Sequence, residues 1–522
     1  MSINASHLAR STVRQLIELG VTDFVLSPGS RNAPLSIALN QAAEKGFIEL
    51  HIRIDERGAA YYALGISQAS KRYVALICTS GTAAANYHPA ALEAYHSHSS
   101  LLFITADRPA RLRKTGANQT TLQDGVLSPL KTIDTDTLVD CASLLTGGPI
   151  HINLQFDEPL LDSDVTAQWL EGISINPISA RSEIRGELIV APRSIIVIGH
   201  DCGSFDRSLV AKVATESGLP VIAEDPLSFD GAIPHAALFL ADPEIREGLK
   251  ADHIIVIGRT TLSRSINAYV AQSSEVTVID PRIKGVDSAR SASTILFDLP
   301  KLVSNNKDLK WAELWKGVGE QARSAMNLEW SEQSVAREIS QALPDGAALF
   351  IGSSRPVRDI EAFAQPRTGV AVFANRGLAG IDGNISTAFG ISTQFKRSYS
   401  ILGDLTFLHD LSALANPIRS DHTVIVIDNN GGGIFSTLPQ AGVDGFEKIF
   451  GTPHNLNVES IIRGFGYSVE KVKTVSDLTR SLHHAGLHFV IVEVPDRTKN
   501  GLVLKELHQR VASAVRMGSN FA

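Results

Sequence analysis

Residues 398–439 read SYSILGDLTFLHDLSALANPIRSDHTVIVIDNNGGGIFSTLP and contain two apolar runs, each of which ends in polar side chains. The first run ends at Asp404 and the second at Asn429. Between them, leucines recur every three residues from Leu405 to Leu414, a spacing that is typical of one face of a helix. Two strands joined by a helix are expected to lie parallel, which places Asp404 and Asn429 at the same edge of one sheet.

The polar groups at this edge have the chemistry of a site for a cation and a phosphate. A carboxylate, an amide oxygen and the backbone carbonyl of Gly431 are hard oxygen ligands, which suit Mg²⁺ or Ca²⁺ better than zinc. The amino end of the helix that follows Gly403 favours a phosphate or diphosphate group. The alternative is purely structural, an Asp cap on a helix and an Asn-Gly turn.

The rest of the chain repeats this alternation of short β-branched runs and longer helical patterns. Runs such as DFVLSPGS, SIIVIG and GAALFIGSS predict strands in the first, second and third parts of the chain. The alternation predicts an α/β fold with mainly parallel sheets, and the length of 522 residues corresponds to about three domains. We expect these domains at residues 1–180, 190–320 and 330–522, with a linker over residues 175–194.

Composition and charge exclude several classes of protein. The net charge is −7 and no basic run carries interleaved aromatic residues, so nucleic acid is not an expected partner. No apolar stretch is long enough for a transmembrane segment. The first twenty residues mix charge and polarity and do not resemble a secretory signal, which favours a cytoplasmic protein.

The three cysteines form no CxxC pair and are predicted to be buried thiols. The chain contains neither a GxGxxG nor a GxxxxGK[ST] motif, which disfavours a dinucleotide dehydrogenase.

Glu56 is a second candidate functional residue, in the first part of the chain. It follows the short alternating run of residues 48–54 and precedes a helical stretch that is rich in small residues. Glu56 is therefore expected at the carboxyl end of a strand, where ligands of parallel sheets bind. The structural alternative is a glutamate in the first turn of a helix, beside Arg57.

The spacing of the late motif resembles the thiamine-diphosphate motif, in which GDG is followed by roughly two dozen residues and NN. The departure is Leu405, which stands where most of that superfamily has glycine. An early glutamate at a strand end, a middle α/β domain and a late metal motif resemble the pyrimidine, central and diphosphate domains of the thiamine-diphosphate decarboxylase superfamily. The resemblance implies that the cofactor binds between the first domain of one subunit and the third of another, and hence a homodimer or homotetramer.

Several loops at predicted strand ends make the resemblance more specific. These loops are SPGSRNAPL (27–35), TSGTAAANYHPAALEA (79–94), TADRPARLRKTGANQT (105–120), NRGLAGIDGNISTAFG (375–390) and DNNGGGIFSTLP (428–439). Together they are similar to the 2-succinyl-5-enolpyruvyl-6-hydroxy-3-cyclohexene-1-carboxylate synthases of menaquinone biosynthesis. That family has GDL in place of GDG, which agrees with Leu405.

The resemblance implies a carboligase that uses thiamine diphosphate and Mg²⁺ or Mn²⁺. In this reaction 2-oxoglutarate is decarboxylated and the succinyl carbanion equivalent adds to isochorismate. Both substrates carry two carboxylates, so a site rich in arginine is expected, because the guanidinium fork can bind a carboxylate through two hydrogen bonds.

The resemblance also implies a role for individual residues of this chain. Glu56 is the acid that activates the cofactor, and Asp404, Asn429 and the carbonyl of Gly431 are the metal ligands. Gly403 and Leu405 belong to the same cofactor motif. The remaining cofactor contacts are apolar, namely Ile381, Ile434, Phe435 and Leu438. The substrate contacts are Ser30, Arg31, Arg108, Gln119, Arg264, Ser354, Arg358 and Arg376.

One position departs from the family pattern. The family commonly has a Lys-Arg pair after a strand of the middle domain, whereas this chain reads GRTTLSRSINA, so that Arg264 is the one candidate for the two basic roles.

Two other functions would also fit part of the pattern. A plain 2-oxo-acid decarboxylase or acetolactate-type synthase would share Glu56 and the metal motif but not the arginine-bearing loops. A catalytically silent subunit would not need to retain Glu56 together with Asp404 and Asn429.

Overall fold

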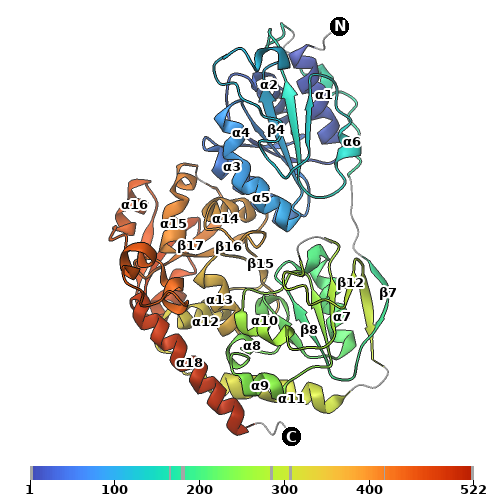
Figure 1. Ribbon diagram of the computed structural model, residues 1–522. Helices are drawn as coiled ribbons and strands as arrows, with labels where there is room; N and C mark the ends of the chain where they lie inside the picture. Colours follow the sequence, from blue (N-terminus) through green and yellow to red (C-terminus); the bar gives the residue numbers. More distant parts are fainter. Residues whose placement is uncertain are drawn as a thin grey trace. The chain divides into compact units, whose positions relative to one another are not determined.

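The computed structural model describes residues 4–163, 166–177, 183–282, 286–304, 308–416 and 418–518 (Figure 1). The chain divides into two compact units. The first, here called unit 1, comprises Met1–Ala180, Asn375–Lys396 and Thr406–Ser420, and the second, unit 2, comprises Arg181–Ala374, Arg397–Leu405 and Asp421–Ala522. The predicted domain end at residue 180 lies among residues 178–182, outside the described residues.

Unit 1 contains a parallel sheet with the strand order β2-β1-β3-β4-β6-β5. Its strands are β1 Asp23–Leu26, β2 Glu49–Ile52, β3 Val74–Cys78, β4 Leu101–Asp107, β5 Thr132–Thr135 and β6 Ile150–Gln155. The main helices of the unit are α1 Ala5–Glu18, α2 Ala33–Glu44, α3 Glu56–Ser70, α4 Thr82–Asn86, α5 His88–Ser97, α6 Cys141–Leu144 and α14 Asn384–Ser392. Every residue of β1, β3 and β4 is buried, as expected for parallel strands that are covered on both faces.

The last part of the chain, in unit 2, forms a second parallel sheet of the same strand order, β15-β14-β16-β17-β19-β18. Its strands are β14 Ala348–Ile351, β15 Ala371–Phe373, β16 Arg397–Gly403, β17 Asp421–Asp428, β18 Val469–Val472 and β19 Leu487–Glu493. The helices of this part that lie in unit 2 include α12 Glu332–Ala342, α13 Arg355–Phe363, α16 Val458–Gly464, α17 Val475–Ser481 and α18 Arg497–Gly518.

The shared strand order fixes where each sheet offers a ligand site. In the first sheet the chain changes direction between β1 and β3, and in the last sheet between β14 and β16. The loops that leave such a pair of neighbouring strands turn to opposite sides, which opens a crevice at the carboxyl ends. The predicted site residues Arg31 and Asp404 both lie in loops or helix starts at these two switch points.

The central sheet in unit 2 has the order β12-β11-β10-β8-β9, with parallel pairs throughout. Its strands are β8 Ser194–Ile198, β9 Val221–Ala223, β10 His253–Ile257, β11 Val276–Ile279 and β12 Thr294–Leu296. A separate two-stranded parallel sheet joins β7 Ile184–Ile189 to β13 Leu299–Val303. Residues 184–189 lie in the segment predicted as a linker, so for these residues the prediction was wrong. Most of these residues are exposed, so the strand needs few apolar side chains, and its sequence shows little apolar periodicity.

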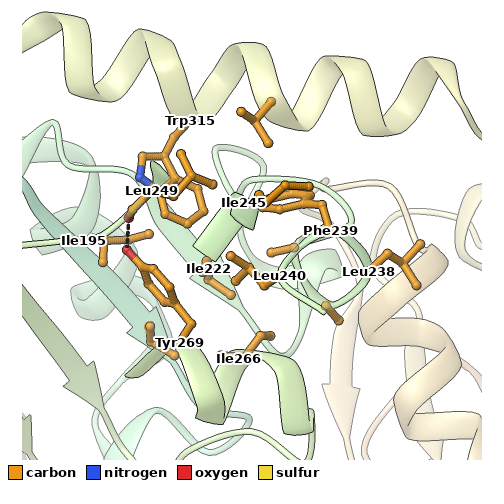
Figure 2. Close-up of a cluster of buried hydrophobic side chains, with 14 of the residues drawn as sticks. Ile195, Ile222, Leu238, Phe239, Leu240, Ile245, Leu249, Ile266, Tyr269 and Trp315 are labelled. Atoms are coloured by element: carbon orange, nitrogen blue, oxygen red, sulfur yellow. Dashed lines mark hydrogen bonds between the residues drawn. The ribbon is translucent and has the colours of Figure 1, made fainter. Parts of the chain in front are cut away.

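The helices of the central part cover both faces of its sheet. They are α7 Arg207–Ser217, α8 Ala236–Phe239, α9 Pro243–Gly248, α10 Arg264–Val270 and α11 Leu309–Ser324. α7 packs on one face, and α8, α9, α10 and α11 pack on the other. Figure 2 shows the apolar cluster around the fully buried Trp315 of α11, whose ring lies 5.5 Å from that of Tyr269. The Tyr269 hydroxyl donates to the carbonyl of Leu249 at 2.7 Å, so this phenol keeps a hydrogen-bond partner inside the core.

The fold confirms the predicted α/β class with parallel sheets. All three cysteines are buried, as predicted. In the described residues no helix combines the length and the apolar character that crossing a bilayer requires. The leucine-rich stretch after Gly403 is not one helix: α15 spans Asp404–His409 and a 3-10 helix, η5, spans Leu411–Ala415. A strict three-residue spacing matches a 3-10 helix better than the 3.6-residue period of an α-helix.

Replacing Trp315 with alanine should destabilise unit 2. Removing a fully buried aromatic ring leaves a cavity in the cluster of Figure 2 and is expected to lower the free energy of unfolding by about 3–5 kcal/mol. Urea denaturation followed by far-UV circular dichroism measures this. Lys316→Ala, which alters the exposed neighbour on the same helix, is the control. An equal, small effect of both variants would contradict the assignment of Trp315 to the core.

Candidate active site

The carboxyl edge of the last sheet brings together the predicted metal ligands. β16 ends at Gly403, and its neighbour β17 ends at Asp428, with Gly403 opposite Ile427. Asp404 and Asn429 follow directly, so the parallel register places them side by side. Asp404 Oδ2 accepts the backbone N–H of Asn429 at 3.2 Å.

The buried carboxylate of Asp404 organises the glycine-rich loop after β17. Besides the N–H of Asn429, its Oδ2 accepts the N–H of Gly431 at 2.9 Å, and its Oδ1 accepts the N–H of Leu405 at 2.6 Å. Asp404 is only 2% exposed, and this burial raises its pKa to about 6, against the opposing effect of the Gly431 N–H. His454 Nε2 lies 3.3 Å from the same Oδ2. The His454 ring donates there through Nε2, because its Nδ1 accepts the N–H of Leu456 at 3.0 Å.

The side chain of Asn429 holds an oxygen that accepts no hydrogen bond in the described structure. Its Nδ2 donates to Glu332 Oε1 at 2.6 Å, whereas its Oδ1 is buried without a partner. A buried polar atom without a partner is costly, and a bound ligand would satisfy it. An orphaned amide oxygen beside the Asp404 carboxylate fits a hard divalent cation such as Mg²⁺.

The backbone of Gly431, the third predicted ligand, is fixed from several sides. Its φ of 138° lies in the region that favours glycine, and a Cβ there would lie 2.1 Å from the carbonyl oxygen of Gly451. Arg497 Nη1 donates to the carbonyl of Asn430 at 2.5 Å, and Gly432 N–H donates to the same Gly451 oxygen at 2.8 Å. The carbonyl of Gly431 itself accepts the N–H of Gly433 at 2.9 Å, so the loop is held by contacts on both sides of the predicted ligand atom.

Other predicted residues of unit 2 make no described contact with the predicted metal ligands. Ser354 has a φ of 75° and precedes α13 after β14, and its carbonyl accepts from Arg358 Nη1 at 2.6 Å. The apolar residues Ile434, Phe435 and Leu438 are half-buried in and after the 3-10 helix η6, Gly433–Thr437. Arg264 is exposed at the start of α10, and no described contact joins it to the other predicted residues.

In unit 1, the carboxyl ends of β1, β3 and β4 bring together the predicted substrate contacts. Arg108 Nη1 donates to Ser80 Oγ at 2.9 Å and to the carbonyl of Gln119 at 2.7 Å, while Gln119 Nε2 donates to the carbonyl of Ser80 at 3.1 Å. Arg31 donates to the carbonyl of Phe156 at 3.1 Å.

Burial lowers the pKa of Arg108, and the positive charge of Arg31 lowers it further. Two guanidinium groups held close together fit an anionic ligand. Ser30, the neighbour of Arg31, is exposed.

Glu56 lies at the first turn of α3, one residue after the N-cap Asp55. It is half-buried, and its Oε2 accepts from Asn86 Nδ2 at 3.3 Å. Burial raises the pKa of Cys78 and of Tyr87, and the negative charge of Glu56 raises both further. Glu56 therefore lies after the carboxyl end of β2, at the start of α3, as predicted.

The predicted residues Arg376 and Ile381 lie in a loop that Glu93 fixes within unit 1. The carboxylate of Glu93 is 2% exposed and accepts the N–H groups of Gly377 at 2.6 Å and Leu378 at 2.7 Å. Arg376 is buried and Ile381 half-buried. A cavity of about 460 Å³ adjoins this loop, and its lining residues are Tyr61, Ala85, His88, Pro89, Leu92, Glu93, Leu378, Gly380 and Asp382.

Sequence reasoning missed four residues that shape these edges, namely Ser80, Glu93, Glu332 and His454. Ser80 lies in the loop of residues 79–94, which resembles the loops of the family. Its position directly after β3 is a signal that could have identified it. Glu93 and Glu332 are helical residues distant in sequence from the groups that they bind. No local pattern marks such contacts.

A second group of metal-type ligands lies elsewhere in unit 2. Glu470, His484 and His488 place ligand atoms within 4.8 Å of one another. The two imidazole rings stack with centroids 4.1 Å apart and an interplanar angle of 25°. The nitrogen lone pairs of stacked rings run side by side and do not converge on one point. This group is therefore a ring stack and not a preformed cation site.

Three family models match successive parts of the chain. They are the N-terminal thiamine pyrophosphate-binding domain of thiamine pyrophosphate enzymes over residues 6–127, the middle domain of thiamine pyrophosphate over residues 168–351, and the C-terminal thiamine pyrophosphate-binding domain over residues 355–494.

Full-length relatives carry one name, 2-succinyl-5-enolpyruvyl-6-hydroxy-3-cyclohexene-1-carboxylate synthase. The protein from Thermobifida fusca (strain YX) is 35% identical over 98% of this chain and 99% of its own length. The protein from Nocardioides sp. (strain ATCC BAA-499 / JS614) is 36% identical over 96% of this chain and 97% of its own. Among solved structures, benzoylformate decarboxylase from Polynucleobacter necessarius matches with a TM-score of 0.63 and 16% identity over 94% of this chain and 99% of its own, which indicates a shared fold.

The raised pKa of Asp404 predicts a pH dependence for cation binding. A divalent cation needs the ionised carboxylate, and below about pH 6 a proton occupies it in the metal-free protein. The affinity for Mg²⁺, measured by calorimetry with thiamine diphosphate present, should be constant above pH 7 and fall up to about tenfold per pH unit below pH 6. Binding of Mg²⁺ to free thiamine diphosphate at each pH gives the background. A corrected affinity that is equal at pH 7.5 and pH 5 would contradict the role of Asp404.

Proposed function

The chain belongs to the family of 2-succinyl-5-enolpyruvyl-6-hydroxy-3-cyclohexene-1-carboxylate synthases, and we propose that the two sheet edges described above supply the two halves of its active site. It is a thiamine-diphosphate-dependent transferase of menaquinone biosynthesis. The observation that carries the site assignment is the orphaned oxygen of Asn429 beside the buried Asp404 carboxylate.

The proposed cofactor half uses the groups at the end of β16 and β17. Asp404, Asn429 and the carbonyl of Gly431 would hold Mg²⁺ or Mn²⁺, and through it the diphosphate group. Gly403 and Leu405 would border the diphosphate, and the half-buried Ile434, Phe435 and Leu438 would exclude water beside the reacting carbon. The oxygen-only ligand set supports Mg²⁺ over zinc.

Thiamine diphosphate, when bound, supplies a thiazolium carbon that attacks a 2-oxo acid and takes up the electrons released on loss of CO₂. Glu56 would accept and return a proton at the aminopyrimidine ring, and its half-buried place at the carboxyl edge of the first sheet supports that role. Ile381 would press against the cofactor from the loop that Glu93 fixes.

The proposed substrates are 2-oxoglutarate and isochorismate. Arg31 and Arg108 converge with Gln119 and would bind carboxylates of isochorismate together with Ser30. Ser354, Arg358 and Arg376 would bind 2-oxoglutarate near the cofactor. Arg264 would contribute one basic group of the middle domain, and its exposed position gives it the weakest support among these residues.

The assembly, location and domain limits are further parts of this proposal. The family resemblance supports a homodimer or homotetramer, in which the Glu56 half of one subunit meets the Asp404 half of another. A cytoplasmic location and domains at residues 1–180, 190–320 and 330–522 are proposed from the sequence pattern alone. Sedimentation equilibrium with and without cofactor tests the assembly.

The reaction is tested by omitting one component at a time. Protein, thiamine diphosphate, Mg²⁺, 2-oxoglutarate and isochorismate are mixed, and CO₂ release and isochorismate loss are followed together. Equal CO₂ release and isochorismate loss, both dependent on 2-oxoglutarate, are expected. Release of CO₂ without loss of isochorismate would indicate a plain decarboxylase, and inactivity of all mixtures would contradict an enzymatic function.

Replacing Glu56 with glutamine should abolish most turnover and leave cofactor binding intact. The amide cannot exchange the proton, and general acid–base catalysis contributes about 10²–10⁴-fold to rates, so kcat should fall by at least about a hundredfold. Binding of thiamine diphosphate with Mg²⁺ is measured on the same samples by calorimetry. Glu49→Gln, at an exposed position of β2, is the control and should keep full activity. An unchanged kcat in Glu56→Gln would reject the assignment.

A further inference from the structure

Glu332 is a buried glutamate that none of the proposed substrate or cofactor contacts includes. It is the first residue of α12 and is 3% exposed. Ser331 caps this helix, and the N–H of Glu332 donates to Asn500 Oδ1 at 3.1 Å. The backbone of Glu332 is thereby fixed, and its side chain extends toward the loop after β17.

The carboxylate of Glu332 makes one short contact to that loop. Its Oε1 accepts from Asn429 Nδ2 at 2.6 Å. A carboxylate oxygen only accepts hydrogen bonds, so the group of Asn429 that faces it must be the NH₂. The amide is planar, and its oxygen consequently points away from Glu332 and is the buried atom without a partner.

The surroundings of Glu332 favour a fixed geometry. Arg355 Nε lies 3.7 Å from Glu332 Oε2, and Nη2 of the same arginine pairs with the buried Asp359, so that one guanidinium group is shared by two carboxylates. Gly433 leaves room for the amide: a Cβ at this position would lie 2.4 Å from Asn429 Nδ2 and 3.5 Å from Glu332 Oε1.

We propose that Glu332 is a positioning residue, which locks the side-chain amide of Asn429 in the orientation that presents its oxygen to the divalent cation. The inference rests on the proposed metal site. Without Glu332, the amide can rotate by half a turn and present NH₂ groups, which repel a cation. Partners of metal ligands that fix ligand orientation typically affect metal affinity by about 10–100-fold.

The test measures how much Mg²⁺ half-saturates the binding of thiamine diphosphate, followed by tryptophan fluorescence or calorimetry without substrate. Glu332→Ala should raise this Mg²⁺ concentration at least about tenfold, and saturating Mg²⁺ should restore binding. Glu332→Gln, whose side-chain oxygen can still accept from Asn429, should change it by less than about threefold. Gly433→Ala, which displaces the amide directly, should behave like Glu332→Ala.

Two controls separate positioning from folding and from the metal assignment. Glu338→Gln removes a charge from the same helix and should leave the Mg²⁺ requirement unchanged. Glu332→Ala combined with Asn429→Ala should be no worse than Asn429→Ala alone, because Glu332 acts through Asn429. If Asn429→Ala raises the Mg²⁺ requirement and Glu332→Ala does not, the role of Glu332 is overturned. If Asn429→Ala also leaves it unchanged, the proposed metal site itself fails.

Discussion

The hydrogen bonds from the backbone of the β17 loop to the carboxylate of Asp404 are the constraint on which the rest of the site depends. One oxygen accepts the N–H groups of both Asn429 and Gly431, and this ties the end of β16 to the turn after β17. The carboxylate thereby fixes the backbone from which the side chain of Asn429 and the carbonyl of Gly431 extend. The same arrangement buries a negative charge, which raises the pKa of Asp404 to about 6 and makes a cation the natural counterpart.

α18 connects this loop to the apolar cluster around Trp315 in unit 2. Its first turns carry Arg497, which holds the carbonyl of Asn430, and Asn500, which holds the backbone of Glu332. Further along, Leu507 and Val511 are buried in the cluster that contains Trp315. Packing far from the metal ligands therefore determines the geometry of the loop, since a shift of α18 would move both polar anchors together.

The sequence was sufficient for the strands, their parallel arrangement and the ends at which polar residues gather, because buried parallel strands are continuous apolar runs. Asp404 and Asn429 could be placed side by side for that reason. The exposed strand β7 was missed because few of its residues are buried. The helix after Gly403 was predicted too long, since Asp410 accepts the N–H of Ser386 at 2.8 Å at the break, a contact across 24 residues. Glu93 and Glu332 act through contacts that span far more of the chain, which no local pattern encodes.

Both edges keep groups that the free protein leaves unfavourably placed. Asn429 has an orphaned oxygen, the buried Asp404 has a raised pKa, and Arg108 has a lowered one beside Arg31. A cation would satisfy the oxygen of Asn429 and the carboxylate of Asp404, and an anion would offset the repulsion between Arg31 and Arg108, so such ligands should stabilise the folded protein. A flexible loop would move these polar groups toward water and so avoid the free-energy cost of burying them. The anchors from Glu332, Arg497 and Glu93 prevent that relaxation, and the geometry for binding is kept before the ligand arrives.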